Sequence, residues 1–364
     1  YGMSFDNYGR KFACSNSDDL QFFVYDGHYA ARNPFFSLPP TRQSIAADGG
    51  AAEVYRISPD EPWRIVRTRW RIGGVVKGVV EGGGRVSGYF TGATGTTVFR
   101  GDAYGEDFVN NTFTGDAGGQ LIHRKKIYPD GVSLIGRRPA DEQNLEFAAS
   151  TDTWVRVVNF ANAPDGTLHV CDMYREVIEH PWSIPEEIKQ HLDLNNGNDR
   201  GRIYRVVPTT TGWHRRARVA LGSATTAELV ATLAHPNGWH RDTASRLLYE
   251  RQDKAAAPLL AALVRDSSSA PAKHHALGVL DGLGALDAGV LTVALRDRDA
   301  RVRERAVYLA EILLARGGTA PGLVEAMASL ADDSDARVRL QLAFSLGASP
   351  DALAGDALGR LLTT

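Results

Sequence analysis

Side chains that can transfer protons or bind charged groups are concentrated in one short segment after a hydrophobic stretch. Within nine positions the chain carries Asp172, Tyr174, Arg175, Glu176 and His180. Such a set can move protons, recognise a carboxylate or bind a cation. We therefore predict Asp172, Arg175 and His180 as catalytic residues.

The same segment also has a purely structural interpretation. Asp172 can cap the turn that follows a strand, and His180 can be a packed surface residue. Arg175 can pair with Glu179 or Asp199. The sequence leaves both interpretations open.

Polar residues on either side extend the candidate site. The predicted substrate-binding residues are Arg156, Asn159, Tyr174, Glu176, Asp199 and Arg200. The first two flank the preceding predicted strand, and the last two lie where the chain returns to its next strand. We expect all of them to meet at one mouth of a central channel on which several strand units converge.

A recurring unit of strand, short turn and strand must position these side chains. The segment 163–166 (Ala-Pro-Asp-Gly) predicts a tight hairpin in which Gly166 has positive φ. The residues around Gly9 and those of segment 111–125 repeat the unit. Repeated antiparallel units of this kind are typical of propellers. Residues 1–208 are therefore predicted to form an incomplete β-propeller of the six-bladed, TolB-like type, with four or five blades.

The composition changes after a short polar linker, residues 209–214. Residues 215–364 are rich in Ala and Leu with helical periodicity, which predicts an all-α solenoid of about four HEAT repeats. Asp299 and Asp335 precede two nearly identical segments and are expected as helix N-caps.

An insert between the last two predicted strands has a helical pattern. Ser183 and Glu186 have the spacing of a capping box. Ile184, Ile188 and Leu192 form an apolar stripe, which favours a brace against the helical array over a lid.

The basic run 123–126 has two interpretations. It can be a solvated strand edge that prevents edge pairing. Alternation also places His123 and Lys125 on one face and Arg124 on the other, so that one face could look into a site.

Composition excludes several classes of function. The formal net charge of -2 gives no global attraction to nucleic acid. No run of 18 apolar residues could span a membrane. The two cysteines lack CxxC, CxxCH and zinc-ligand spacing, and the glycine tract 82–84 lacks the context of a phosphate-binding loop.

Three stretches carry a family resemblance, at residues 90–102, 110–126 and 155–208. They resemble the β-propeller of the soluble quinoprotein glucose and sorbosone dehydrogenase superfamily. More closely, they resemble the planctomycete-type membrane-bound dehydrogenase or haem-binding proteins, in which HEAT repeats and a cytochrome c module follow the propeller. The chain begins at Tyr1 inside a hairpin pattern, and against this family we expect it to be truncated at both ends.

The resemblance implies a periplasmic or otherwise extracytoplasmic protein that oxidises a sugar or polyol. Pyrroloquinoline quinone and calcium are the implied cofactors, and haem c would belong only to a C-terminal module outside this chain. A cytochrome c-type electron acceptor or a partner protein would dock on the helical array. The alternative hypothesis is a scaffold that binds a glycan or protein without catalysis.

Overall fold

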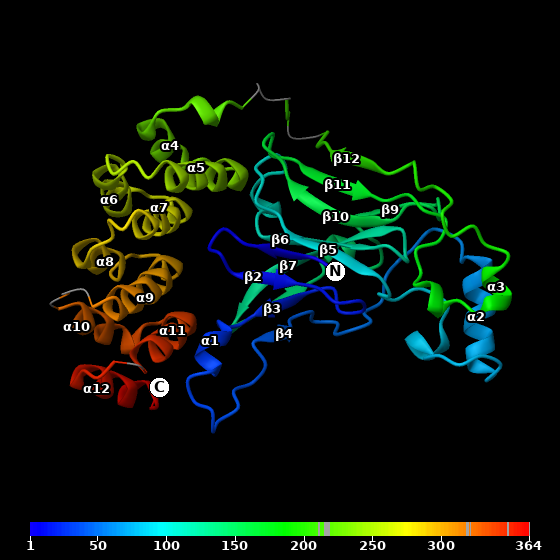
Figure 1. Ribbon diagram of the computed structural model, residues 1–364, viewed down its shortest axis with the longest axis horizontal. Helices are drawn as coiled ribbons and strands as arrows, with labels where there is room; N and C mark the ends of the chain where they lie inside the picture. The colour runs from blue at the N-terminus through cyan, green and yellow to red at the C-terminus, as the bar shows by residue number, and fades with distance from the viewer. Residues whose placement is uncertain (210–211, 215–218, 318–319, 321, 348, 364) are drawn as a thin grey trace. The chain divides into compact units, whose positions relative to one another are not determined.

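The chain divides into two compact units, Tyr1–His214 and Arg215–Thr364. The first unit consists mainly of strands and the second of helices (Figure 1). The computed structural model describes residues 1–209, 212–214, 219–317, 320, 322–347 and 349–363. Residues 210–211 of the predicted linker and 215–218 of the predicted solenoid lie outside the described residues.

Three antiparallel sheets make up the first unit. The first sheet has the order β1 (Met3–Phe5), β2 (Lys11–Ala13), β3 (Gln21–Phe23), β4 (Arg42–Ser44). The second has the order β5 (Ala93–Val98), β6 (Asn111–Asp116), β7 (Leu121–Asp130), β8 (Ser133–Arg137), with β9 (Ala148–Ala149) also paired to β7. The third has the order β10 (Val157–Asn162), β11 (Leu168–Asp172), β12 (Arg202–Val206).

The predicted β-propeller of four or five blades is wrong. Among the described residues the strands form sheets of four, five and three strands, and none closes into a propeller. The hairpin units of the sequence are real, but a hairpin pattern is local and is shared by every antiparallel sheet. Radial closure depends on packing between sheets, which that pattern does not encode.

The predicted turn of the β10–β11 hairpin is confirmed. The Gly166 backbone N–H donates to the Ala163 carbonyl oxygen over 3.0 Å, and Gly166 has a φ of 86°. Gly9, at the equivalent place before β2, has a φ of 73°. Both glycines occupy the left-handed region that other residues avoid.

The core of the first unit lies between its sheets. Phe99, Phe113, Val157 and Leu168 are buried together, which joins the second sheet to the third. A second apolar cluster contains Cys14, whose neighbours include Phe90 and Leu121. The packed sheets form the rigid frame from which the connecting segments project.

Three helices lie in these connections: α1 (Gly27–Ala30), α2 (Pro62–Ile72) and α3 (Glu186–Lys189). The predicted capping box at Ser183 is wrong, because α3 begins after Pro185 and has no side-chain cap. The apolar stripe of the insert packs on α2: Ile184 and Ile188 are buried with Trp63. The insert therefore has an apolar partner within its own unit, whereas the sequence favoured the helical array.

The second unit is helical. Its helices are α4 (Thr226–Thr232), α5 (Gly238–Arg251), α6 (Ala256–Asp266), α7 (Ala270–Gly282), α8 (Ala288–Ala294), α9 (Ala300–Ala315), α10 (Leu323–Ala328), α11 (Ala336–Leu346) and α12 (Ala352–Leu361). α5, α7, α9 and α11 contact one another in sequence, as do α4, α6, α8, α10 and α12. The unit thus has two rows of helices, and its assignment to the HEAT class stays a prediction.

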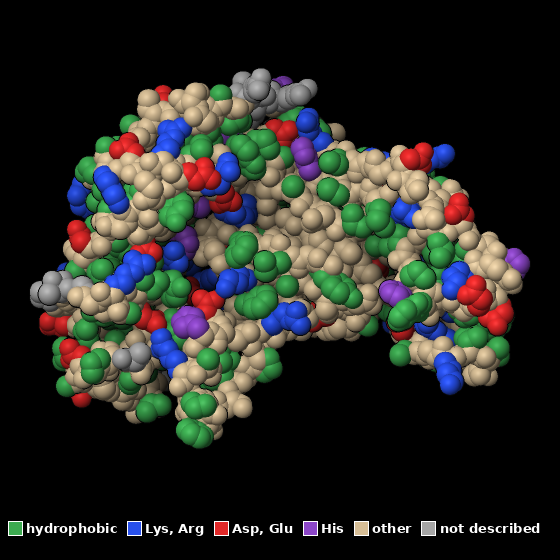
Figure 2. All heavy atoms as spheres, in the orientation of Figure 1, with side chains coloured by type: hydrophobic (Ala, Val, Ile, Leu, Met, Phe, Trp, Pro, Cys, Tyr) green, Lys and Arg blue, Asp and Glu red, His purple; other side chains and the backbone are tan. Residues whose placement is uncertain are grey.

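Helix caps and charges in this unit follow ordinary rules. Asp299 accepts a hydrogen bond from the Arg301 backbone N–H (2.9 Å) and Asp335 from that of Arg337 (2.8 Å), so both predicted N-caps are confirmed. Basic and acidic side chains are interspersed over the visible face of the helical unit (Figure 2). In the described part of the chain, no helix combines the length and hydrophobicity needed to cross a membrane.

Candidate functional site

Helix α2 presents a row of arginines. Pro62 occupies its first turn, where the missing backbone N–H costs nothing. Arg64, Arg67 and Arg71 are spaced i, i+3, i+7 and therefore share one face. Arg64 and Arg67 are buried, and Arg71 is half-buried. A buried row of like charges needs anionic partners.

A narrow pocket opens beside this row. Its lining comprises Arg67, Thr68, Arg71, Val79, Val80, Glu81, Arg85, Val86 and Tyr89. Three of these residues are arginines and one is a glutamate, so the lining carries a positive excess. The enclosed space is about that of one water-sized group, so the pocket is too small for a tricyclic quinone.

Contacts with the surrounding chain fix two of the pocket's arginines. Arg71 donates from Nη1 to the Val79 carbonyl oxygen (3.3 Å) and from Nη2 to the Ser183 carbonyl oxygen (3.1 Å). Arg85 donates from Nε to the Gly82 carbonyl oxygen (3.0 Å), and its guanidinium carbon lies 5.1 Å from the Tyr89 ring centroid. The cationic groups are therefore held in place before any ligand arrives.

Buried donors remain available at this pocket. Arg67 is only 3 % exposed, and its Nε has no hydrogen-bond partner; the Nε of Arg71 is also buried and unpartnered. Burial lowers the pKa of the Arg67 guanidinium, Glu179 opposes this effect, and the charges of Arg64 and Arg71 add to it. An anion in the pocket would accept hydrogen bonds from these unpartnered Nε atoms and would offset the positive charge of the neighbouring arginines.

Two glycines shape the pocket wall. A side chain at Gly78 would lie 2.5 Å from the Arg71 Nε, where it would block that donor. A side chain at Gly82 would overlap the Tyr89 ring. Gly82 of the glycine tract therefore allows the ring of Tyr89, a lining residue, to pack against the backbone.

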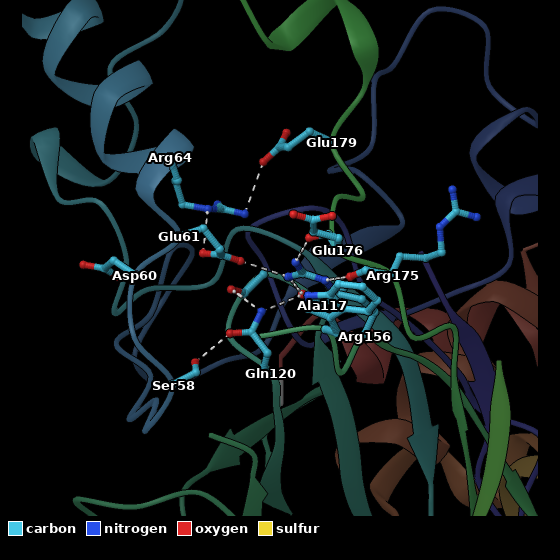
Figure 3. A network of polar contacts seen from close by, with 12 residues as sticks. Ser58, Asp60, Glu61, Arg64, Ala117, Gln120, Arg156, Arg175, Glu176 and Glu179 are labelled. Atoms are coloured by element: carbon cyan, nitrogen blue, oxygen red, sulfur yellow. Dashed lines mark hydrogen bonds and ion pairs between the residues drawn. The ribbon is translucent and has the colours of Figure 1, made fainter. Parts of the chain in front are cut away.

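A second network surrounds Arg156, which is fully buried at the start of β10 (Figure 3). Its Nη1 donates to the Ala117 carbonyl oxygen (3.0 Å) and to Glu61 Oε1 (3.1 Å). Its Nε and Nη2 donate to the carbonyl oxygens of Arg175 (2.9 Å) and Glu176 (2.6 Å). Arg156 therefore holds three chain segments together.

Asp172, a predicted catalytic residue, also has a structural environment. It is 2 % exposed, and its Oδ1 accepts hydrogen bonds from the backbone N–H groups of Arg156 (2.7 Å) and Tyr174 (2.8 Å). Its Oδ2 is buried without a hydrogen-bond partner. These contacts match the structural interpretation, in which Asp172 caps the turn after its strand.

The network brings Arg175 and Glu176 close to Arg156 through their backbones, while their side chains point elsewhere. Arg175 donates from Nη2 to the Leu194 carbonyl oxygen (2.6 Å). Glu176 accepts from Asn196 Nδ2 (2.8 Å). The pairing of Arg175 with Glu179 or Asp199 does not appear among the ion pairs of the described residues; Glu179 pairs with the arginines of α2.

Tyr174 lies apart from the arginine row, in the left-handed backbone region with a φ of 51°. Its hydroxyl donates to Asp152 Oδ2 (2.8 Å), and this bond raises the pKa of the phenol. The Arg202 guanidinium lies 3.6 Å from the ring centroid. One face of the phenol ring is therefore already covered.

The remaining predicted site residues are exposed and dispersed. Asn159 accepts from the Phe160 backbone N–H (2.9 Å). His180 Nδ1 accepts from the Trp182 backbone N–H (3.2 Å). Asp199 and Arg200 form only an exposed ion pair at 3.8 Å. None of the side-chain hydrogen bonds and ion pairs described for these four residues involves the Asp172 carboxylate.

Three of the four residues of the basic run on β7, from His123 to Lys125, are buried, so its interpretation as a solvated edge is wrong. Lys125 Nζ lies 2.8 Å from Asp19 Oδ1 and 2.6 Å from Asp48 Oδ1. His123 Nδ1 lies 2.7 Å from Glu146 Oε2. Burial opposes ionisation of Glu146, but its bonds with His123 and other donors prevail and lower its pKa. These contacts fasten β7 to neighbouring loops.

The implied cofactors find little support in the side chains. In the portion of the chain that the structure describes, no three His, Cys, Asp or Glu residues converge as a metal site. The pocket at α2 does not have room for the ring system of pyrroloquinoline quinone. Calcium and pyrroloquinoline quinone therefore stay predictions from the resemblance, and we derive no step through either.

Comparison with protein families gives a match over the first unit. A family model described as a domain of unknown function, DUF7133, matches residues 1–210. No curated protein matches the chain. The matched region contains α2, the pocket and the Arg156 network.

Proposed function

The chain belongs to the DUF7133 family, whose description gives no activity, and we propose from the site that its first unit binds an acidic carbohydrate. A uronate carboxylate of the ligand enters the pocket between Arg67, Arg71 and Arg85. The sugar rings stay outside the narrow pocket, on the surrounding surface. The proposed function is recognition rather than catalysis.

The observation that carries this proposal is the unpaired Nε of Arg67. Leaving a buried donor without a partner costs about 1–3 kcal/mol, and more for a charged group. A carboxylate oxygen at that position would restore the missing bond as a charge-assisted one. Because Arg71 offers a second unpaired Nε beside it, the pocket suits an oxyanion better than a neutral hydroxyl.

An exposed indole supports a carbohydrate as the rest of the ligand. Trp182 is 92 % exposed and directly precedes Ser183, whose carbonyl oxygen holds Arg71. The imidazole of His180 lies edge-on to the indole, with ring centroids 5.4 Å apart. A flat aromatic surface beside a polar pocket suits a sugar ring, which has an apolar face and a polar edge.

Oxidation of a neutral sugar or polyol stays a prediction from the resemblance. Asp172, one of its predicted catalytic residues, is buried and accepts two backbone hydrogen bonds, so the geometry favours binding over proton abstraction. The periplasmic location and the cytochrome c-type acceptor likewise stay predictions.

Calorimetric titration of the full chain tests the proposal. A galacturonate oligosaccharide should bind, and a neutral galactose oligosaccharide of equal length should bind at least about tenfold more weakly, since one charge-assisted hydrogen bond is worth about 1.5–3 kcal/mol. Arg85→Gln, at an exposed position, should weaken uronate binding by a similar factor. Arg200→Gln, also exposed but outside the pocket lining, is the matched control and should bind as the native chain does.

Further ligands in the same titration identify which anion the pocket prefers. Equal binding of acidic and neutral oligosaccharides, or binding of neither, would refute the proposal. Preference for a sulfated oligosaccharide over the uronate would show that the pocket recognises a different anion. Free sulfate is included to measure how much of any binding is simple ion pairing.

A further inference from the structure

Glu179 already occupies the arginine row from within the protein. Its Oε1 lies 3.3 Å from Arg64 Nη2, and its Oε2 lies 3.3 Å from Arg67 Nη1 (Figure 3 shows Arg64 and Glu179). Its side chain is 22 % exposed, whereas the two arginine side chains are 4 % exposed. The carboxylate therefore reaches the buried cations from the solvent side.

The segment that carries Glu179 contacts α2 at several points. Val177 and Ile184 are buried against Trp63 of the helix. The Ser183 carbonyl oxygen accepts from Arg71. Residues 177–184, which we call the latch, thus touch two of the three arginines that line the pocket.

We propose that Glu179 is an internal competitor that sets the anion affinity of the pocket. This inference rests on the proposed function, because the ligand carboxylate and Glu179 share the guanidinium of Arg67. Each of these two carboxylates reduces the positive charge available to the other. Contact of Glu179 with Arg67 therefore lowers the affinity of the pocket for the ligand. By thermodynamic reciprocity, the ligand must weaken the latch as much as the latch weakens the ligand.

Substitution of Glu179 measures this coupling. Glu179→Gln should tighten uronate binding about tenfold, within the usual range of coupling between sites. Glu81→Gln is the matched control, because Glu81 is an exposed glutamate that lines the same pocket. Glu81→Gln measures the general effect of removing one negative charge. Its increase in uronate affinity should be clearly smaller than that of Glu179→Gln. Glu179→Asp retains the charge but is too short to bridge both arginines, and it should also tighten binding.

Hydrogen exchange of the latch provides a readout independent of affinity. In the native chain, saturating galacturonate oligosaccharide should speed exchange of the peptide covering residues 177–184. In Glu179→Gln the peptide should exchange faster from the start and change little on ligand addition. Thermal melts of each variant confirm that it is folded.

The outcomes separate this inference from the proposed function. If the native chain binds uronate but Glu179→Gln binds no more tightly than Glu81→Gln, Glu179 is only a structural brace and the inference is overturned. If Glu179→Asp behaves like the native chain, the effect is long-range electrostatics, which also overturns it. If no variant binds uronate, the proposed function itself fails.

Discussion

Asp116, at the end of β6, is a carboxyl group whose burial should dominate the pH dependence of its sheet. It is fully buried, and its Oδ1 accepts a hydrogen bond from the Gly118 backbone N–H over 3.0 Å. Burial raises its pKa to about 6, although backbone N–H groups and Arg64 oppose the change. We predict that Asp116→Asn stabilises the first unit at neutral pH.

The magnitude follows from the two protonation equilibria. Raising the pKa from 3.8 in the unfolded chain to about 6 in the folded one costs about 3 kcal/mol of stability at neutral pH. A raised pKa means that this contribution is fully present below about pH 4 and is lost as pH rises through about 6. The asparagine does not titrate, so its advantage over aspartate should grow by about 2.4 kcal/mol between pH 4 and pH 7.5, and the rest of the change falls below pH 4.

Native-state hydrogen exchange of peptides from β6 and β7 provides the assay, because it reports on the first unit separately from the helical one. Comparing variant and native chain at the same pH cancels the intrinsic exchange rate. Any constant cost of burying the amide also cancels, because only the change with pH is used. Asp130→Asn, at an exposed position in β7, is the matched control and should show no such change. A stability difference between Asp116→Asn and the native chain that stays constant from pH 4 to pH 7.5 would refute the reasoning.

Two further stability predictions follow from the packing. Gly166→Val should destabilise the first unit by about 1 kcal/mol or more, because valine disfavours a φ of 86° and its side chain would meet Asp102; an unchanged melting temperature would contradict this placement. Arg156→Met should cost about 3 kcal/mol or more in unfolding free energy, because it removes the buried hydrogen bonds that Arg156 donates to Glu61 and to three carbonyl oxygens. Arg200→Met is its exposed control, and equal unfolding free energies for the two variants would show that the Arg156 network contributes little.

Local structure could be predicted where a residue type strongly favours one backbone conformation or one capping position. Gly9 and Gly166 have positive φ, and glycine is the residue that adopts it without strain. Asp299 and Asp335 cap helices through their own carboxylates. These features depend only on residues that are close in the chain, so the sequence is enough to predict them.

Arrangement between distant segments could not be predicted in the same way. The hairpin pattern predicted blades, but β7 pairs with both β8 and β9 and the third sheet has only three strands. Asp172 has a residue type suited to catalysis, yet its partners are backbone N–H groups, one of them 16 residues earlier in the chain. The i, i+3, i+7 spacing of Arg64, Arg67 and Arg71 was a signal for the arginine row, and the prediction overlooked it.

Arg156 and Arg67 show why residue type and burial together still do not identify a binding residue. Both side chains are nearly inaccessible and belong to one charged region. The Nε, Nη1 and Nη2 of Arg156 all donate to oxygens of the folded chain, so folding uses its hydrogen-bonding capacity. The Nε of Arg67 has no such acceptor and lies at a pocket. A ligand oxygen placed at the pocket could accept the charge-assisted hydrogen bond that the Arg67 Nε does not make within the folded chain, whereas Arg156 offers no such donor.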